Sequence, residues 1–247
     1  MALGIDRFLA DGFDLRAHLA EFLGLSPEEL EHRLPHGTAD LAALHPGAFD
    51  PEGAESFYED AVGTLHLLEL GAWHLGSADY IADTLRLQQH FARGQVLDFG
   101  GGIGTHALAA AALPSVERVW VVDLNPENRA FVTRRAQQLG LAERVRCFRD
   151  LAAGELPQRF DTIVCLDVLE HLADPASQIE TFAARLAPTG IALLNWYFFR
   201  GFAGEYPFHI DDPVVVERFF RTLQRVFLEV FHPWLITTRA YRPMPAD

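Results

Sequence analysis

The stretch Val96-Leu97-Asp98-Phe99-Gly100-Gly101-Gly102-Ile103-Gly104-Thr105-His106 decides the fold of this chain. An apolar run ends in an acid, a glycine-rich segment follows, and a run rich in Ala and Leu begins at about Thr105. This order predicts a β-strand, a tight turn and a helix, which together form the entrance to a nucleotide-type pocket. Gly100, Gly102 and Gly104 let the backbone turn and approach a ligand closely.

The glycine pattern alone fits two kinds of ligand. Residues 102–107 also satisfy G-x-G-x-x-A, a fingerprint of dinucleotide binding, so an NAD(P)-dependent oxidoreductase is one alternative. Asp98 favours the other kind of ligand. A carboxylate at the end of the strand repels an anionic pyrophosphate and attracts a ligand that carries an ammonium group.

The composition indicates a globular protein without a membrane span. Of the 247 residues, 49% are hydrophobic and 22% are charged. No apolar run reaches the roughly 18–20 residues of a membrane span, and we expect no signal peptide. Cys147 and Cys165 lie in apolar runs, which favours reduced, buried thiols and a cytoplasmic location. The net charge of −14 repels phosphate backbones and predicts that no nucleic acid is bound.

Residues 1–92 are expected to form a broken series of helices. Apolar side chains recur at helical spacing over residues 6–23, and Ser26-Pro27-Glu28-Glu29 is typical of a helix start. The Gly-, His- and Pro-rich stretch 35–51 predicts a connector. Further helices are expected over residues 52–92, with breaks at Gly71 and Gly76.

Strands and helices alternate over residues 93–247. Strands are expected at 96–99, 118–122, 144–148, 161–166 and 191–196, and helices at 105–112, 126–139 and 175–186. This alternation predicts a parallel sheet with helices on both faces and a ligand site at the carboxyl ends of the strands. After a helix at 213–223, two apolar runs at 225–232 and 234–241 predict an antiparallel pair of strands.

Acids also follow the second, third and fourth strands. Asp123 follows the second strand, where a carboxylate can accept both hydroxyl protons of a ribose. Its alternative role is to cap a helix, but Asn125 before a proline fills that role better. Asp150 follows the third strand beside Arg149, which can pair with it. The fourth strand leads into Leu166-Asp167-Val168-Leu169-Glu170-His171.

In this order, the five segments resemble the class I methyltransferases, which use S-adenosylmethionine (SAM). Residues 96–104 resemble the family's first motif, and the segment ending in Glu170-His171 resembles that of small-molecule enzymes, including those that methylate quinone precursors. The resemblance covers about residues 94–242 and departs from the family at Arg149, where glycine is usual. It implies an α/β, Rossmann-like fold whose seven-stranded, mostly parallel sheet has an antiparallel last strand. Residues 93–247 would form the SAM-binding core and residues 1–92 a helical lid.

The resemblance also implies which residues contact SAM. Asp98 would hold the ammonium group, Asp123 the ribose hydroxyls and Asp150 the adenine amino group. The full expected set is Asp98, Gly100, Gly102, Gly104, Asp123, Leu124, Asp150, Leu151, Leu166 and Asp167.

Methyl transfer from a sulfonium requires alignment of the acceptor, exclusion of water and at most the removal of one proton. His171 after the fourth strand and His209 after the fifth are candidates for the general base, because histidine titrates near neutrality. His106 beside the glycine loop is a third histidine that can touch the ligands. Each of these histidines can instead be a hydrogen-bonded structural residue. No metal is expected, because Leu194 precedes Asn195 where catechol-type enzymes have an Asp-Asn pair.

The expected reaction is SAM-dependent methyl transfer to oxygen or carbon of a small molecule. Aromatic residues crowd the region after the fifth strand and, with Tyr58, Trp73 and Tyr80, can wall an apolar or aromatic substrate site. For the oligomeric state, a homodimer is the assembly to be tested. The alternatives are an NAD(P)-dependent oxidoreductase and a SAM-binding regulatory or partner module without turnover.

Overall fold

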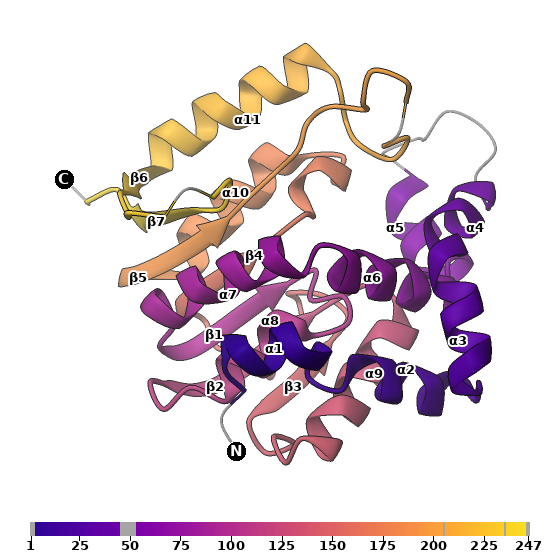
Figure 1. Ribbon diagram of the computed structural model, residues 1–247. Coiled ribbons are helices and arrows are strands. Elements are labelled where there is room, and N and C mark those ends of the chain that lie inside the picture. Colours follow the sequence, from indigo (N-terminus) through magenta and orange to yellow (C-terminus); the bar gives the residue numbers. More distant parts are fainter. Residues whose placement is uncertain (1–2, 45–52, 205, 235, 246–247) are drawn as a thin grey trace.

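A seven-stranded sheet lies at the centre of the molecule, with helices on both of its faces (Figure 1). The computed structural model describes residues 3–44, 53–204, 206–234 and 236–245. The strands are β1 (Gly94–Phe99), β2 (Val116–Val122), β3 (Val145–Phe148), β4 (Phe160–Cys165), β5 (Leu186–Leu194), β6 (Phe227–Val230) and β7 (Arg239–Pro243).

The strand order is β3-β2-β1-β4-β5-β7-β6. Neighbouring strands from β3 through β5 are parallel, whereas β7 lies antiparallel between β5 and β6. The predicted fold, including the antiparallel last strand, is confirmed. The chain changes direction across the sheet between β1 and β4, so a crevice is expected at the carboxyl ends of these two strands.

One face of the sheet is covered by α1, α7, α8 and α9, and the other by α10 and α11 (Figure 1). Every residue of α8 is buried, because its small Ala side chains let the helix lie close to the sheet. The bounds are α1 (Ile5–Asp11), α7 (Ala78–Phe91), α8 (Thr105–Ala111), α9 (Pro126–Gln138), α10 (Pro175–Arg185) and α11 (Pro213–Val226), with a 3-10 turn, η4 (Leu169–His171), after β4.

The remaining helices form a group of their own beside α9 (Figure 1). Leucines of this group pack on Ile103 of the glycine loop and Phe131 of α9, so the group is joined to the ligand-binding edge. Its elements are α2 (Leu15–Leu23), α3 (Pro27–Arg33), η1 (Leu34–His36), α4 (Gly37–Ala43), α5 (Ala54–Ser56), the π-helical turn η3 (Phe57–Ala61) and α6 (Leu65–Gly76).

Two predictions for this group are corrected by the structure. Part of the expected connector, Gly37–Ala43, is helical, while the rest of it, from residue 45 to 51, lies outside the described residues. A Cβ at Gly37 would lie 2.8 Å from backbone atoms of α6, so this glycine permits a close helix crossing. Gly71 lies inside α6 instead of breaking it, and a Cβ there would lie 2.7 Å from Leu19. Gly76 ends α6, as expected.

The antiparallel pair at the C-terminal end is confirmed, but its strands are shorter and farther apart in sequence than predicted. The ring of Trp234 packs 5.1 Å from that of His90 on α7, so this residue contributes to the helical layer instead of pairing in the sheet. Residue 235, within the second predicted run, lies outside the described part. Among the described residues, no helix is both long and apolar enough to cross a membrane.

Candidate functional site: buried acids at the carboxyl edge of the sheet

The glycine loop connects β1 to α8 and requires glycine for two physical reasons. Gly100 and Gly104 have φ values of +71° and +77°, which side chains with a Cβ rarely adopt. A Cβ at Gly100 would lie 2.3 Å from Val168, and one at Gly104 would lie 2.7 Å from Val132. The loop is therefore fixed between the segment after β4 and the helix after β2. Gly102 has φ +52° and its N–H donates to Asp123.

Asp98 presents a carboxylate oxygen that has no partner. The residue is only 5% exposed, and its Oδ2 has no hydrogen-bond partner among the described residues. Burial, together with the nearby charge of Asp123, raises the pKa of Asp98 to about 7. A buried, unpaired carboxylate is costly, and a cationic ligand removes that cost. The ammonium group of SAM fits this requirement, whereas a pyrophosphate does not.

Asp123 is held in a fixed orientation by three donors. Its Oδ2 accepts from Gly102 N at 2.8 Å, and its Oδ1 accepts from Asn125 N at 2.9 Å and from Asn128 Nδ2 at 3.2 Å. Burial nevertheless raises its pKa to about 6. Each carboxylate oxygen has more than one lone-pair site, so the arrangement leaves acceptors for a pair of ribose hydroxyls. Asn125 caps α9 as predicted, accepting from Glu127 N.

The third acid, Asp150, lies in an ion-pair cluster at the surface. Its Oδ2 is 2.8 Å from Arg149 Nη1, which confirms the expected pairing, and its Oδ1 accepts from Ala152 N. Arg149 also pairs with Glu55 and Glu59. The Arg149 guanidinium lowers the pKa of the Asp150 carboxyl. Arg149, at the position where the family usually has glycine, thus ties the N-terminal helices to the end of β3.

Asp167, after β4, has an unusual backbone. Its φ is +55°, which is uncommon for a residue other than glycine and carries strain. Asn195, which follows the neighbouring β5, holds it by two hydrogen bonds. The backbone N–H of Asp167 donates to Asn195 Oδ1, and Asn195 Nδ2 donates to Asp167 Oδ1. The expected SAM neighbours Leu124, Leu151 and Leu166 follow β2, β3 and β4 and are all half-buried.

His171 and His209 are brought together with their rings edge to face. Their ring centroids are 4.8 Å apart with an interplanar angle of 86°. Enclosure lowers the pKa of His171 to about 3 and also lowers that of His209, so both rings are neutral at pH 7. Glu170 lies beside them and is 1% exposed. Tyr58, from the N-terminal helices, places its hydroxyl 3.3 Å from His171 Nδ1.

The third histidine, His106, is engaged in the core. Its Nε2 lies 2.7 Å from Thr84 Oγ1, whose proton is donated to Ile81 O, so the ring N–H donates to the threonine. Its backbone carbonyl accepts from Gln88 Nε2. The structure therefore binds this ring to α7, in keeping with the alternative of a structural histidine.

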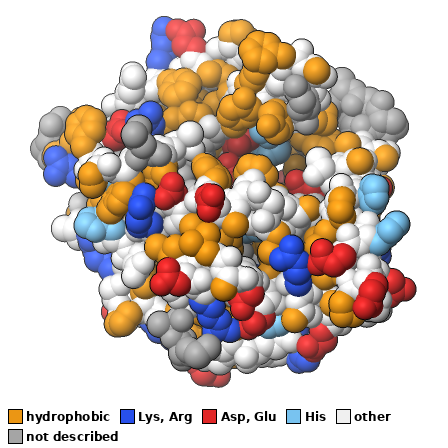
Figure 2. All heavy atoms as spheres, in the orientation of Figure 1, with side chains coloured by type: hydrophobic (Ala, Val, Ile, Leu, Met, Phe, Trp, Pro, Cys, Tyr) orange, Lys and Arg blue, Asp and Glu red, His pale blue; other side chains and the backbone are white. Residues whose placement is uncertain are grey.

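The N-terminal helices contact residues that are expected to bind SAM. Leu70 lies 3.0 Å from the position a Cβ would take at Gly102. The carbonyl of Gly63 accepts from Asn125 Nδ2, and His66 Nδ1 accepts from Asn128 Nδ2. Figure 2 shows acidic and histidine side chains within a hollow rimmed by hydrophobic ones on this face of the molecule.

Sequence reasoning missed three contributors to this site. Asn128 orients Asp123, and its only sequence signal is its position in the first turn after the Asn125-Pro126 cap. Desolvation and the charge of Asp167 raise the pKa of Glu69 on α6 to about 7. Arg135 is fully buried and donates to Ile103 O of the glycine loop. These roles depend on tertiary packing, which no local pattern encodes.

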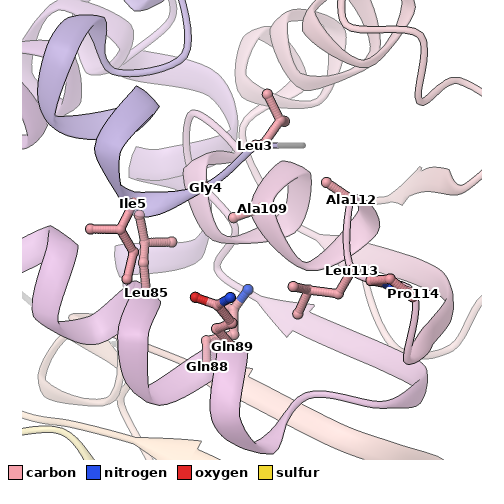
Figure 3. A pocket seen from close by; sticks show the side chains of 10 residues that line it. All are labelled: Leu3, Gly4, Ile5, Leu85, Gln88, Gln89, Ala109, Ala112, Leu113 and Pro114. Atoms are coloured by element: carbon pink, nitrogen blue, oxygen red, sulfur yellow. The ribbon is translucent and has the colours of Figure 1, made fainter. Parts of the chain in front are cut away.

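A separate cavity of about 150 Å³ lies between the start of α1, α7 and the end of α8 (Figure 3). Leu85, Gln88, Ala109 and Leu113 are among the side chains that line it. It is at the opposite end of α8 from the glycine loop, so we assign it no part in binding the cofactor.

Comparison with known proteins agrees with this geometry. Residues 72–200, a little more than half of the chain, match the methyltransferase domain family. A ubiquinone biosynthesis O-methyltransferase from Xanthomonas euvesicatoria is 34% identical over 119 residues, covering 47% of this chain and 47% of that protein. The chain thus matches about half the length of this curated relative. It belongs to the class I SAM-dependent methyltransferases.

Solved structures with low sequence identity support the fold alone. The [4+2]-cyclase SpnF superposes with a TM-score of 0.51 at 21% identity, covering 64% of this chain and 59% of that one. A ribosomal protein L11 methylase from Lactobacillus delbrueckii gives a TM-score of 0.50 at 15% identity, covering 70% of this chain and 81% of that one. One fold therefore carries different chemistries, and the function has to be argued from the site.

Proposed function

We propose that this protein transfers the methyl group of SAM to an oxygen or carbon atom of a small apolar or aromatic molecule. The observation that carries the proposal is the buried Asp98 carboxylate, whose Oδ2 has no partner among the described residues. SAM supplies an ammonium group for this oxygen and ribose hydroxyls for Asp123, at the adjacent strand end. The same pair of acids disfavours the NAD(P)-dependent alternative, because a dinucleotide bound at the glycine loop would place its anionic pyrophosphate, and no ammonium group, beside Asp98.

The acceptor side of the site is formed by His171 and His209. Both are half-buried and neutral, so each offers a nitrogen lone pair to a hydroxyl proton of the acceptor. Aromatic rings enclose them. Tyr206 stacks on His209 with ring centroids 5.0 Å apart and an interplanar angle of 14°, and Tyr58 packs edge-on to His171 at 5.9 Å. A flat, apolar acceptor suits such walls.

Residues 1–92 are proposed to act as a lid on residues 93–247. Contacts from Gly63, His66 and Leu70 to the SAM-binding residues support this role. A lid excludes water and holds the acceptor in line with the methyl group, which are the main demands of this reaction.

The test is to incubate the protein with SAM that carries a labelled methyl group and a panel of small phenols, diphenols and quinols. Formation of S-adenosylhomocysteine (SAH) together with a labelled product is expected. The non-catalytic alternative would be supported if SAM and SAH bind but no label is transferred to any acceptor in the panel. A matched Asp98→Asn variant should bind and transfer far less.

A further inference from the structure

We propose that Glu170, His171 and His209 bind one divalent first-row transition-metal ion. One ligand atom from each side chain lies within 4.8 Å of the other two. Zn²⁺ holds nitrogen and oxygen ligands at about 2.0–2.2 Å, which places neighbouring donors roughly 3–3.5 Å apart. Side-chain rotations that bring the donors closer by roughly 1.5 Å at most would therefore complete the site.

The two imidazoles are already fixed in the form that binds metals. His171 Nδ1 lies 3.1 Å from Phe208 O, and His209 Nδ1 lies 3.2 Å from Phe199 O. A carbonyl oxygen only accepts, so each Nδ1 carries the proton and donates it. The lone pair of each ring is then on Nε2. Histidines that bind metals are typically oriented by this kind of bond from the other ring nitrogen to a backbone carbonyl.

Glu170 supplies an independent indication that a cation belongs here. Its Oε1 accepts from Tyr197 N at 3.1 Å, whereas its Oε2 is buried and has no hydrogen-bond partner among the described residues. For a residue that is 1% exposed, an unpaired carboxylate oxygen carries a large desolvation cost. A bound cation would supply the missing partner and remove this cost.

The backbone holds the two sequence segments together at this point. Ile210 N donates to Glu170 O at 2.8 Å, which joins the loop after β5 to η4. Arg200 Nε donates to His209 O at 2.9 Å and restrains the loop from its other side. The three ligands, 39 positions apart at most in sequence (170 to 209), are therefore adjacent because of tertiary structure.

The donor set selects the class of ion. Two imidazoles and one carboxylate suit Zn²⁺, Mn²⁺, Fe²⁺ or Co²⁺, whereas Mg²⁺ prefers oxygen ligands alone. The site is also distinct from the Asp167–Asn195 pair, whose atoms are hydrogen-bonded to each other.

The role of the ion rests on the proposed function, although its binding does not. A cation here would orient and acidify a hydroxyl group of the acceptor beside the methyl group. With the ion bound, the Nε2 lone pairs of His171 and His209 are used by the ion, so neither histidine then accepts the hydroxyl proton. The hydroxyl oxygen forms the new bond to the methyl carbon as the carbon–sulfur bond of SAM breaks, and the hydroxyl proton passes to solvent water. This assigns hydroxylated aromatic molecules as the substrate class, since Tyr206 stacked on His209 favours a flat ring.

The experiment is a titration of the full-length, chelator-treated protein with Co²⁺, followed by visible absorption, and with Zn²⁺ in competition. One Co²⁺ per chain is expected, displaced by Zn²⁺. Glu170→Gln and His209→Ala should each weaken binding at least 100-fold while still binding SAH, which shows that the variants are folded. His32→Ala is the matched control, because His32 and His36 form a separate exposed histidine pair with rings 5.7 Å apart.

The proposal is overturned if the wild-type protein binds no Co²⁺, if both site variants bind it as the wild type does, or if only His32→Ala loses it. Binding of Co²⁺ without SAH would leave the metal site standing and contradict the proposed function. Binding of SAH without binding of Co²⁺ would overturn the metal site and leave the proposed function standing.

Discussion

Asp167 and Asn195 hold each other through two reciprocal hydrogen bonds across the carboxyl ends of β4 and β5. Asp167 N donates to Asn195 Oδ1 at 2.5 Å, and Asn195 Nδ2 donates to Asp167 Oδ1 at 2.9 Å. Asn195 Nδ2 also donates to Tyr80 Oη at 2.9 Å, which extends the contact to α7. Because Asp167 has φ +55°, the pair holds a strained residue at the edge of the proposed SAM site.

Replacing Asn195 with Ala should release this strained turn. Losing these two partly buried hydrogen bonds costs roughly 1–3 kcal/mol, so we expect SAH binding to weaken by about tenfold in a calorimetric titration. Tyr80→Phe removes one hydroxyl but keeps the Asp167–Asn195 pair, and it should change the affinity less than threefold. Equal affinity in Asn195→Ala and the wild type would show that the pair does not shape the pocket.

The Asp98→Asn substitution should have opposite effects on binding and stability. It removes a buried charge, so the ligand-free protein should gain on the order of 2 kcal/mol in free energy of unfolding at pH 7 or above. SAH binding should fall at least 100-fold, because the ammonium group loses its carboxylate. Chemical denaturation and calorimetry measure the two effects. A variant that is less stable and binds SAH normally would contradict the assignment.

The affinity for SAH should increase with pH below neutrality. The folded, ligand-free protein holds a proton on Asp98 up to a pKa of about 7, whereas an ordinary aspartate, with a pKa of 3.8, loses it at much lower pH. The Asp98 carboxyl therefore contributes most to the free energy of unfolding at low pH, and this contribution is lost as the pH rises through about 7. Binding an ammonium requires the carboxylate, so we expect roughly tenfold tighter SAH binding at pH 7.5 than at pH 6.

Adenosine is the matched control for this pH effect. It can use Asp123 but carries no ammonium group for Asp98. Its affinity should therefore rise much less than that of SAH over the same interval. An identical pH dependence for the two ligands would assign the effect to Asp123 or to another group.

Arg135 should be far more important for stability than its neighbour Arg134. The buried Arg135 guanidinium donates to Ile103 O, Gly12 O and Phe13 O, joining the N-terminal helices to the glycine loop. Arg135→Leu leaves these acceptors unpaired and should cost about 3 kcal/mol or more. Arg134→Leu loses only an exposed pair with Glu21 and should cost less than about 1 kcal/mol. Denaturant unfolding compares the variants, and equal costs would contradict the proposed network.

The parallel sheet and the acids at its strand ends could be predicted because their signals are local. Apolar runs that end in Asp98 and Asp123 mark strand ends, and glycines that need positive φ mark the turn between β1 and α8. The pairing of Arg149 with Asp150 is also local and is confirmed. In each case the deciding residues are close in sequence.

The rest depends on contacts between distant segments. His171 and His209 each stood out in the sequence, but their meeting requires the Ile210–Glu170 backbone bond. The helix α4 lies where a connector was expected, and its first residue, Gly37, packs against the backbone of the distant helix α6. Arg135 lies on a helix with many charged residues, and nothing in the sequence distinguishes it from those that are exposed.

The most direct test of the central claim is a calorimetric titration of the wild-type protein with SAH, with NAD⁺ and NADP⁺ as comparison ligands. We predict one SAH bound per chain, with no measurable heat from either dinucleotide. Binding of NAD⁺ or NADP⁺ without binding of SAH would contradict the account.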